Sequence, residues 1–306
     1  MPRFKTPRTA SLLIAAWVAL PNVGQAAQAA AATAPMSCAP SARGIPPRPA
    51  EALGGSGFAD AIDGLSEPER DEAIRRELLA GNLPRFLHQL QPASLAAQLP
   101  GGQWVQLTLC VLSDYLSVGS DDDFLRVPMG LASALAVAAR FGFTLPTRRM
   151  VDLIYRQAAV RLAPQPLPAG DAMRSTAYYL RHQALVTQQL TDRGERTGPL
   201  TAGHKKDLVL SPRLWRVPGR LAIYGWHRSA DAPIQPLSTV HGARYADYSH
   251  GVRLIGRTVW LDGVPKSIFE LLADPLLAPL LSDEGPLPLV AELLAGAGLS
   301  AADPAR

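Results

Sequence analysis

The sequence lacks a long apolar run, an excess of charge of one sign and the glycine-rich loops that bind phosphates or dinucleotides. Its most apolar early stretch, residues 10–20, is about half the roughly 20 residues that a membrane-spanning helix needs. The composition of 47% apolar, 18% charged and 6% aromatic residues is typical of a globular chain, and it excludes collagen-like and disordered proteins. We therefore expect a globular protein without stable membrane insertion.

The formal net charge of +4 says little about the folded part of the chain. Arg3, Lys5 and Arg8 lie in an N-terminal segment that has no acidic residue, and the remaining sequence has 27 basic against 26 acidic side chains. This near balance is not the basic footprint of a nucleic-acid-binding protein. No nucleic-acid partner is predicted.

Residues 1–29 have the three parts of a secretory signal: a basic start, an apolar run and the small-x-small sequence Ala27-Gln28-Ala29. We expect cleavage after Ala29 and a secreted or periplasmic protein. Residues 30–57 are rich in alanine and proline and predict a flexible tether. Residues 58–298 are expected to form a single α+β domain, and residues 299–306 a disordered tail.

The chain has two cysteines, Cys38 and Cys110. An oxidising compartment would permit a disulfide between them, but the sequence does not establish that they meet. Cys110 lies within an apolar, β-rich run, and a small buried hydrophobic residue is the favoured interpretation. Neither cysteine has a nearby base that would make it a nucleophile.

The pattern of apolar residues predicts an α+β fold in three parts. Helices dominate residues 58–193, with a helix capped by Ser66, a strand pair or one long bent strand over 104–118, and a second helix capped by Thr147. Short β-type runs separated by proline, glycine and histidine follow in 208–261, which predicts an irregular sheet bearing long polar loops. Helices return over 267–281 and 287–298.

Histidines gather in the predicted sheet region. Four of the six, His204, His227, His241 and His250, fall within 47 residues, in polar or glycine-rich surroundings. Glycine beside histidine lets the backbone approach a ligand closely. We expect at least three of these histidines to surround one pocket, with His88 and His182 outside it.

A short part of this region resembles the active-site motif of L,D-transpeptidases, enzymes that join peptidoglycan stem peptides. His241-Gly242 precedes Ser249-His250-Gly251-Val252-Arg253, as a His-Gly precedes Ser-His-Gly-Cys-x-Arg in that family. The resemblance covers some 14 residues, and Val252 stands where the family has its nucleophilic cysteine. It implies paired histidines and an anion-contacting Arg253, without cysteine chemistry.

The same segment also supplies residue types used in acyl transfer: a base, an orienting carboxylate and a hydroxyl. The candidate catalytic residues are His241, Asp247, Ser249 and His250. Residues so close in sequence seldom converge as a triad, because a strand directs successive side chains to opposite faces. A turn-capping role is therefore the favoured interpretation of Ser249.

Candidate substrate-binding residues are the other polar side chains of this region. They are His204, Lys205, Asp207, His227, Tyr248 and Arg253. Lys205 with Lys206 suits a carboxylate or phosphate, although a solvated turn explains two lysines as well. His227 or Arg253 is expected to stabilise developing negative charge.

No cofactor is predicted, and zinc is the alternative that the histidines leave open. His204, His227, His241 and His250 offer more than the three ligands that a catalytic zinc requires. No compact motif such as His-Glu-x-x-His is present. Asp121, Asp122 and Asp123 lack the alternating spacing of a calcium loop, so we expect a capped turn there.

Together these features favour an exported hydrolase or group-transfer enzyme that acts on a cell-envelope polymer, peptidoglycan or glycan. His241 or His250 would be the general base, oriented by Asp247. The alternative is a secreted module that binds a glycan or peptide without chemistry, and a structural role for the loops is the third. The sequence leaves the oligomeric state open.

Overall fold

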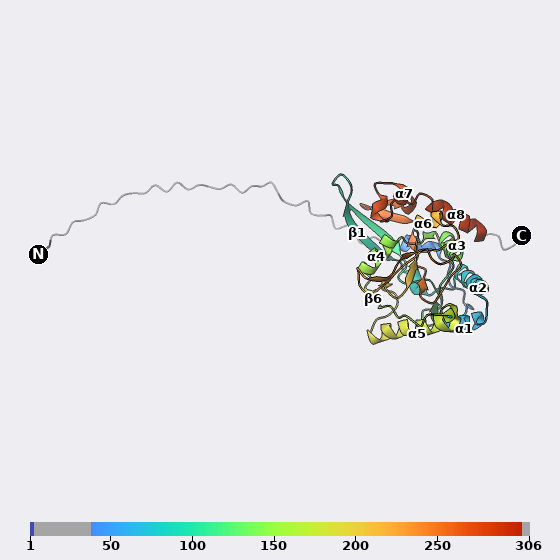
Figure 1. The fold of residues 1–306 in the computed structure, drawn as a ribbon. Helices are drawn as coiled ribbons and strands as arrows, with labels where there is room; N and C mark the ends of the chain where they lie inside the picture. Colours follow the sequence, from blue (N-terminus) through green and yellow to red (C-terminus); the bar gives the residue numbers. More distant parts are fainter. Residues whose placement is uncertain (3–37, 302–306) are drawn as a thin grey trace. The chain divides into compact units, whose positions relative to one another are not determined.

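The computed structural model describes residues 1–2 and 38–301, and the expected signal lies almost wholly outside them. The body is an α+β fold with eight α-helices, as the sequence predicts (Figure 1). The helices are α1 Gly55–Ile62, α2 Glu67–Leu79, α3 Leu131–Phe141, α4 Arg148–Gln157, α5 Thr176–Asp192, α6 Arg213–Arg216, α7 Ile268–Ala273 and α8 Val290–Ala301. Short 3-10 helices are η1 Ala39–Gly44, η2 Arg85–His88, η3 Asp171–Arg174 and η4 Ala278–Leu280.

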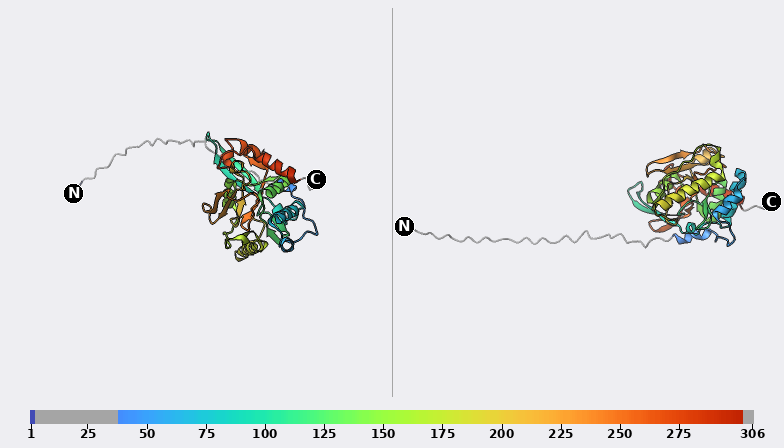
Figure 2. Two further views of the ribbon diagram at one scale, coloured as in Figure 1. Left: turned by 45° about the vertical axis from the view of Figure 1, so that its right-hand side comes forward. Right: turned by 90° about the horizontal axis from the view of Figure 1, so that it is seen from below.

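A six-stranded sheet forms the centre of the fold. Its strands are β1 Gln91–Gln98, β2 Trp104–Val111, β5 Phe143–Thr144, β12 Ile255–Gly256, β13 Thr258–Leu261 and β14 Val264–Ser267. The central order is β14-β13-β2-β12-β5, and β1 pairs with β2 as a long antiparallel hairpin that projects from the body (Figures 1 and 2). Helices α7 and α8 lie at one end of the domain, and α1 and α5 at the other (Figure 1).

A smaller four-stranded sheet carries the residues singled out for function. Its order is β10-β9-β8-β11, from β8 Lys206–Leu208, β9 Ile223–His227, β10 Pro233–Ser238 and β11 His250–Gly251. Strands β8 and β11 are parallel, with His250 opposite Lys206 and Gly251 opposite Asp207. Because directly paired residues point to the same face, His250 and Lys206 lie side by side.

Two further strand pairs complete the secondary structure of the described residues. Strands β3 Ser117–Gly119 and β4 Phe124–Arg126 are antiparallel, whereas β6 Val160–Arg161 and β7 Thr201–Ala202 are parallel. Strands β1 to β4 thus occupy residues 91–126, so the first half of the domain is less helical than expected. Strand β1 was not predicted, because its sequence QPASLAAQ has few β-favouring residues.

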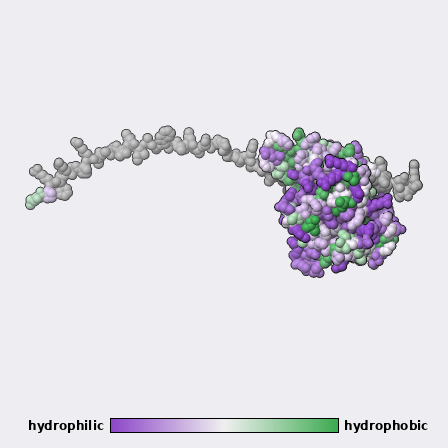
Figure 3. Space-filling model, viewed as in Figure 1, coloured by the Kyte–Doolittle hydropathy of each residue, from purple (hydrophilic) through white to green (hydrophobic). Residues whose placement is uncertain are grey.

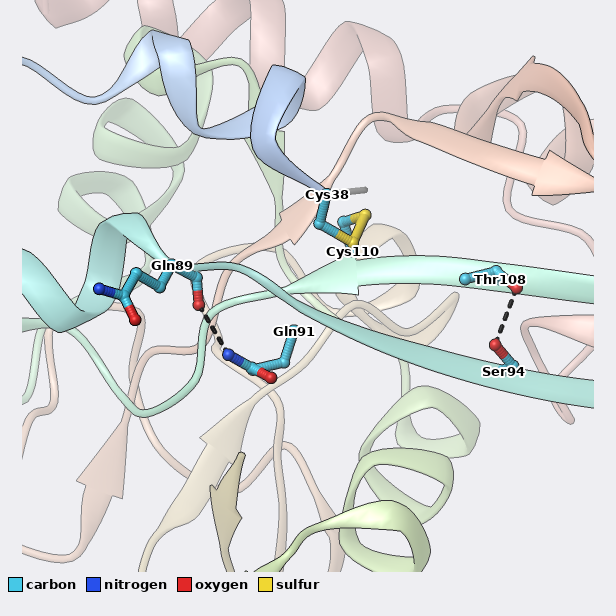
Figure 4. Close-up of a disulfide and its surroundings, with 6 residues drawn as sticks. All are labelled: Cys38, Gln89, Gln91, Ser94, Thr108 and Cys110. Carbon is cyan, nitrogen blue, oxygen red and sulfur yellow. Dashed lines mark hydrogen bonds between the residues drawn. A yellow bond between two sulfur atoms is a disulfide. The ribbon is translucent and has the colours of Figure 1, made fainter. Parts of the chain in front are cut away.

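The segment from Cys38 onward packs against the body, although the sequence predicted order only from near Phe58, 20 residues later. Cys38 forms a disulfide with Cys110 of β2 (Figure 4), Ile45 is buried, and the Arg48 guanidinium donates to the Gly119 carbonyl over 3.1 Å. The expected tether of residues 30–57 is therefore fixed from Cys38 on, and its earlier part lies outside the described residues.

The disulfide corrects the interpretation of Cys110 as an unpaired hydrophobic residue. Cys110 is buried as expected, but its sulfur is bonded to Cys38, which is 72 residues away in sequence. Beside it, the hydroxyls of Ser94 and Thr108 form a 2.8 Å hydrogen bond between β1 and β2 (Figure 4). The bridge joins the N-terminal segment to the centre of the larger sheet.

The C-terminal part is helical, as predicted. Helix α8 packs on α3 and continues to Ala301, so residues 299–301 of the expected tail are helical and 302–306 lie outside the described residues. Within the described part, no helix is long and apolar enough to cross a bilayer. The face in Figure 3 mixes hydrophilic and hydrophobic residues without one extended apolar area.

Candidate functional site

Strands β8, β9 and β11 and the loop before β11 bring a group of polar and aromatic side chains together. We call it the His241–His250 cluster, and its members are Lys206, Trp226, His241, Tyr245, Asp247 and His250. The parallel pairing of β8 with β11 places Lys206 beside His250, and the loop of residues 239–249 brings Tyr245 and Asp247 back to the same face.

Asp247 and His250 form the buried end of the cluster. Oδ2 of Asp247 lies 3.8 Å from Nε2 of His250, and both side chains are at most 1% exposed. Burial alone would raise the pKa of Asp247, but His250, hydrogen bonds from Ser249 and the Lys206 ammonium hold it below its ordinary value. Burial lowers the pKa of His250 to about 4, although Asp247 opposes this shift. Near neutral pH, an ionised carboxylate therefore lies beside a neutral imidazole.

Ser249 orients Asp247 and is not placed to act as a nucleophile. Its backbone N–H and its hydroxyl both donate to Oδ1 of Asp247, over 2.7 and 2.6 Å, and the residue is fully buried. The Tyr245 hydroxyl donates to Oδ2 over 3.1 Å. The turn-capping interpretation of Ser249 therefore describes the geometry, and its place among the catalytic candidates is corrected.

His241 is the accessible imidazole of the pair. Its ring stacks on Tyr245 with centroids 4.0 Å apart and planes 5° from parallel, and its centroid lies 5.8 Å from that of His250. The side chain is only half-buried, and burial lowers its pKa. His241 is therefore neutral near pH 7 and can accept a proton from a molecule outside the fold.

Several buried polar atoms of the cluster have no hydrogen-bond partner. Both ring nitrogens of His250 and Nε1 of Trp226 are of this kind, although buried polar groups in folded proteins are nearly always paired. Trp226 also has a φ of 56°, a left-handed conformation that is uncommon for a bulky residue. Unpaired donors and backbone strain together are typical of functional sites.

A groove of ≈ 980 Å³ adjoins the cluster through Tyr245. The N-terminal turn of α2, residues 171–175 before α5 and residues 242–245 line it, and Arg174 forms ion pairs there with Glu67 over 2.9 Å and with Asp171 over 3.1 Å. Tyr245 both lines the groove and donates to Asp247. A ligand in the groove would therefore contact the side chain that stacks on His241.

The opposite face of β8 and β11 contacts a buried polar network. Four of the predicted substrate-binding residues belong to this network: His204, Lys205, Asp207 and Arg253. Its members are Asp114, Tyr115, Arg126, His204, Lys205, Asp207 and Arg253, all at most 3% exposed. His204 pairs with Asp114 over 3.1 Å, and Asp207 accepts from the Tyr115 hydroxyl over 2.8 Å. Burial lowers the pKa of His204 to about 4 and raises that of Asp207 to about 6.

Within this network, Arg253 and Lys205 donate hydrogen bonds to backbone carbonyls. Arg253 donates to the carbonyls of Leu112 and Thr201 over 2.7 and 2.6 Å, and its guanidinium lies 4.4 Å above the Tyr115 ring. The Lys205 ammonium donates to the Tyr248 carbonyl. Both side chains therefore stabilise the fold. The prediction that they bind a polymer substrate is corrected, because they are buried and bonded to the chain itself.

His227 and Tyr248 are also interior residues. His227 hydrogen-bonds to Asp152 of α4 over 3.0 Å and stacks on Tyr155, with centroids 4.5 Å apart. The Tyr248 hydroxyl accepts from the Leu167 N–H over 2.6 Å. Neither is placed to contact a substrate or to stabilise charge beside His241.

The prediction that at least three histidines surround one pocket is wrong, because only His241 and His250 of the four lie together in the cluster. His204 and His227 bond to different carboxylates, and His182, expected to lie apart, packs against Tyr248 with ring centroids 5.2 Å apart. In residues 38–301, no three side chains of the histidine, cysteine, aspartate and glutamate types are close enough to hold a metal. Zinc remains an untested alternative.

The sequence did not single out Tyr245 or the ion pair of Asp114 with Arg126, because no motif surrounds them. Lys206 was noted only as one of two adjacent lysines, and Trp226 was not among the candidate site residues. They are brought into the cluster by the pairing of β8 with β9 and β11, which the sequence does not specify.

Comparison with protein-family models, curated proteins and solved structures finds no match.

Proposed function

We propose that this protein is an exported hydrolase or group-transfer enzyme that acts on a cell-envelope polymer, peptidoglycan or glycan. The observation that carries the proposal is the pair of adjoining imidazoles. One is half-exposed, and the other is buried without a hydrogen-bond partner beside an ionised carboxylate. Buried titratable groups with shifted pKa values and unused hydrogen-bonding capacity are the features that acid–base catalysis requires.

In this proposal His241 is the general base. It accepts a proton from water or a hydroxyl as that oxygen forms a bond to the carbonyl or glycosidic carbon. The imidazolium then returns the proton to the leaving oxygen or nitrogen as the second bond breaks. Behind it, His250 and Asp247 stabilise the positive charge that His241 carries between the two steps.

A polymer substrate is supported by the groove beside Tyr245. Its volume of ≈ 980 Å³ is at the upper end of the range for small-molecule sites, and it is lined by charges of both signs. Export is supported by the Cys38–Cys110 disulfide, because such bonds persist in oxidising compartments. The expected signal in residues 1–29 points to the same secreted or periplasmic location.

Variants of the two histidines test the proposal on isolated cell-wall material. We expect His241→Ala and His250→Ala to lower the release of soluble fragments by roughly a hundredfold or more, the usual value of a positioned acid or base. His88→Ala is the matched control, since His88 is a half-buried histidine of η2 outside the cluster. Circular dichroism verifies folding, and a folded His250→Ala variant with full activity would refute the proposed centre.

The alternative function is binding of a glycan or peptide without chemistry. The groove favours it, because Arg244 and Tyr245 supply a cation and an aromatic ring to its lining. A wild-type protein that sediments with cell walls but releases no fragments, and a His241→Ala variant that sediments equally well, would establish this alternative over the enzyme.

A further inference from the structure

Two side chains of the His241–His250 cluster, Trp226 and His250, have buried nitrogens without hydrogen-bond partners, and Lys206 lies beside both. Nε1 of Trp226 is a donor only, and a neutral imidazole such as His250 supplies one donor and one acceptor. All three nitrogens are buried without a partner among the described residues. Leaving a buried donor unpaired costs about 1–3 kcal/mol, so a ligand that pairs with these nitrogens would recover that free energy on binding.

The three side chains adjoin one another through β8. Lys206 is the register partner of His250 in β11 and of Gly225 in β9, the residue before Trp226. Nζ of Lys206 lies 5.0 Å from the centroid of the Trp226 ring. Lys206 therefore adjoins both His250, through the strand register, and the indole ring of Trp226, through its ammonium group.

The backbone at Trp226 is held in its conformation by its surroundings. Gly225 has a φ of 108°, and a Cβ there would lie 3.3 Å from Val151 and 3.4 Å from the His227 ring. Trp226 follows with its own φ of 56°, a conformation that costs of order 1–3 kcal/mol. In this conformation the indole of Trp226 packs against Lys206 and Tyr248.

The carboxylate of the cluster does not use up these donors. Asp247 accepts two hydrogen bonds from Ser249 and one from Tyr245. No ion pair within 4.0 Å joins Lys206 to a carboxylate in the described part of the chain. The ammonium of Lys206 and the N–H of Trp226 are thus left for a group that is not part of the protein.

We infer that Lys206, Trp226 and His250 form a subsite for an anionic group of the substrate, a carboxylate or a phosphate. The inference rests on the proposed function, since it names the chemical class that lies beside the acid–base pair. The charge-assisted bond from Lys206 supplies most of the affinity. The N–H groups of Trp226 and His250 fix the orientation of the anion.

The test follows the indole N–H resonance of Trp226, assigned with Trp226→Phe, in the purified protein. Sodium acetate and sodium phosphate are titrated separately at constant pH and ionic strength. We expect a saturable shift with a Kd of about 10 mM or tighter for at least one anion. Saturation by acetate alone identifies a carboxylate subsite, and saturation by phosphate alone a phosphate subsite.

Lysine variants show whether the subsite is specific. Lys206→Met should raise the Kd at least about tenfold through loss of the charged donor, and Lys206→Arg should retain binding within about threefold. Lys266→Met, at an exposed lysine of β14, is the matched control and should leave the Kd unchanged. The remaining indole resonances report folding, and Lys206→Gln replaces Lys206→Met if that variant does not fold.

Three results would overturn the inference: no saturable shift with either anion, an unchanged Kd in Lys206→Met, or equal weakening in Lys266→Met. Because binding is measured without turnover, the outcome is separate from that of the proposed function. Anion binding by a protein that does not degrade walls removes the enzyme and leaves the subsite. An activity that depends on the histidines, in a protein that binds neither anion, removes the subsite and leaves the enzyme.

Discussion

The Cys38–Cys110 disulfide should provide a large share of the stability of the fold. It closes a loop between residues separated by 72 positions, and the chain-entropy relation for a loop of this length gives about 4 kcal/mol at 25 °C. This is comparable to the whole free energy of unfolding of a marginal domain. We expect the double variant Cys38→Ala, Cys110→Ala to have its urea midpoint lowered accordingly, with an m-value at least as large, since the unfolded chain is no longer constrained.

The assay separates the bond from the packing of its sulfur atoms. Cys110 is fully buried, so alanine there also removes core contacts. Comparing oxidised with reduced wild-type protein isolates the bond, and the double variant with and without reductant controls for other effects of the reagent. A difference below about 1 kcal/mol between oxidised and reduced protein would refute the entropic argument.

Two predictions concern buried charge. Asp114→Asn should lower the free energy of unfolding by about 3–5 kcal/mol in urea, because it leaves Arg126 in the interior without its carboxylate; a loss below 1 kcal/mol would contradict this. Lowering the pH from 7 to 4 should destabilise the fold, because His204 and His250 have folded pKa values of about 4 and the unfolded chain takes up protons first. The lowered pKa values of His182, Asp114 and Asp247 act in the same direction. Asp207, with its pKa raised to about 6, and Lys205, with its pKa lowered to about 7, oppose the trend, and a flat stability profile between pH 7 and pH 4 would refute the prediction.

Features of the fold that depend on neighbours in sequence were predictable. Glu69 accepts a hydrogen bond from the Ser66 backbone N–H at the start of α2, and Thr147 accepts from the N–H of Met150 at the start of α4, as their capping patterns indicate. Strand β1 was missed because its stability comes from its full antiparallel register with β2. The disulfide was left open for the same reason: residues 72 positions apart meet only in the folded chain.

In the candidate site, too, contacts between residues near in sequence were predictable and contacts between distant residues were not. His241, Asp247 and His250 are near one another in sequence, and the sequence placed them together. The partners of His204 and His227 lie 90 and 75 residues away, in Asp114 and Asp152, and no spacing rule links them. Histidines in similar glycine-rich surroundings therefore received the same prediction although they have different roles.

The alternation of side chains along β8 and β11 explains how one small sheet serves both stability and function. Lys206 and His250 point to the face of the cluster, where donors remain unpaired, whereas Lys205 and Asp207 point into a network in which their polar atoms are bonded. The buried network fixes the position of the two strands, and hence the spacing of Lys206 and His250. Most polar atoms of the network are bonded, although Nδ1 of His204 is not, whereas both ring nitrogens of His250 lack a partner, and for this reason we place the proposed anion subsite on the face of Lys206 and His250.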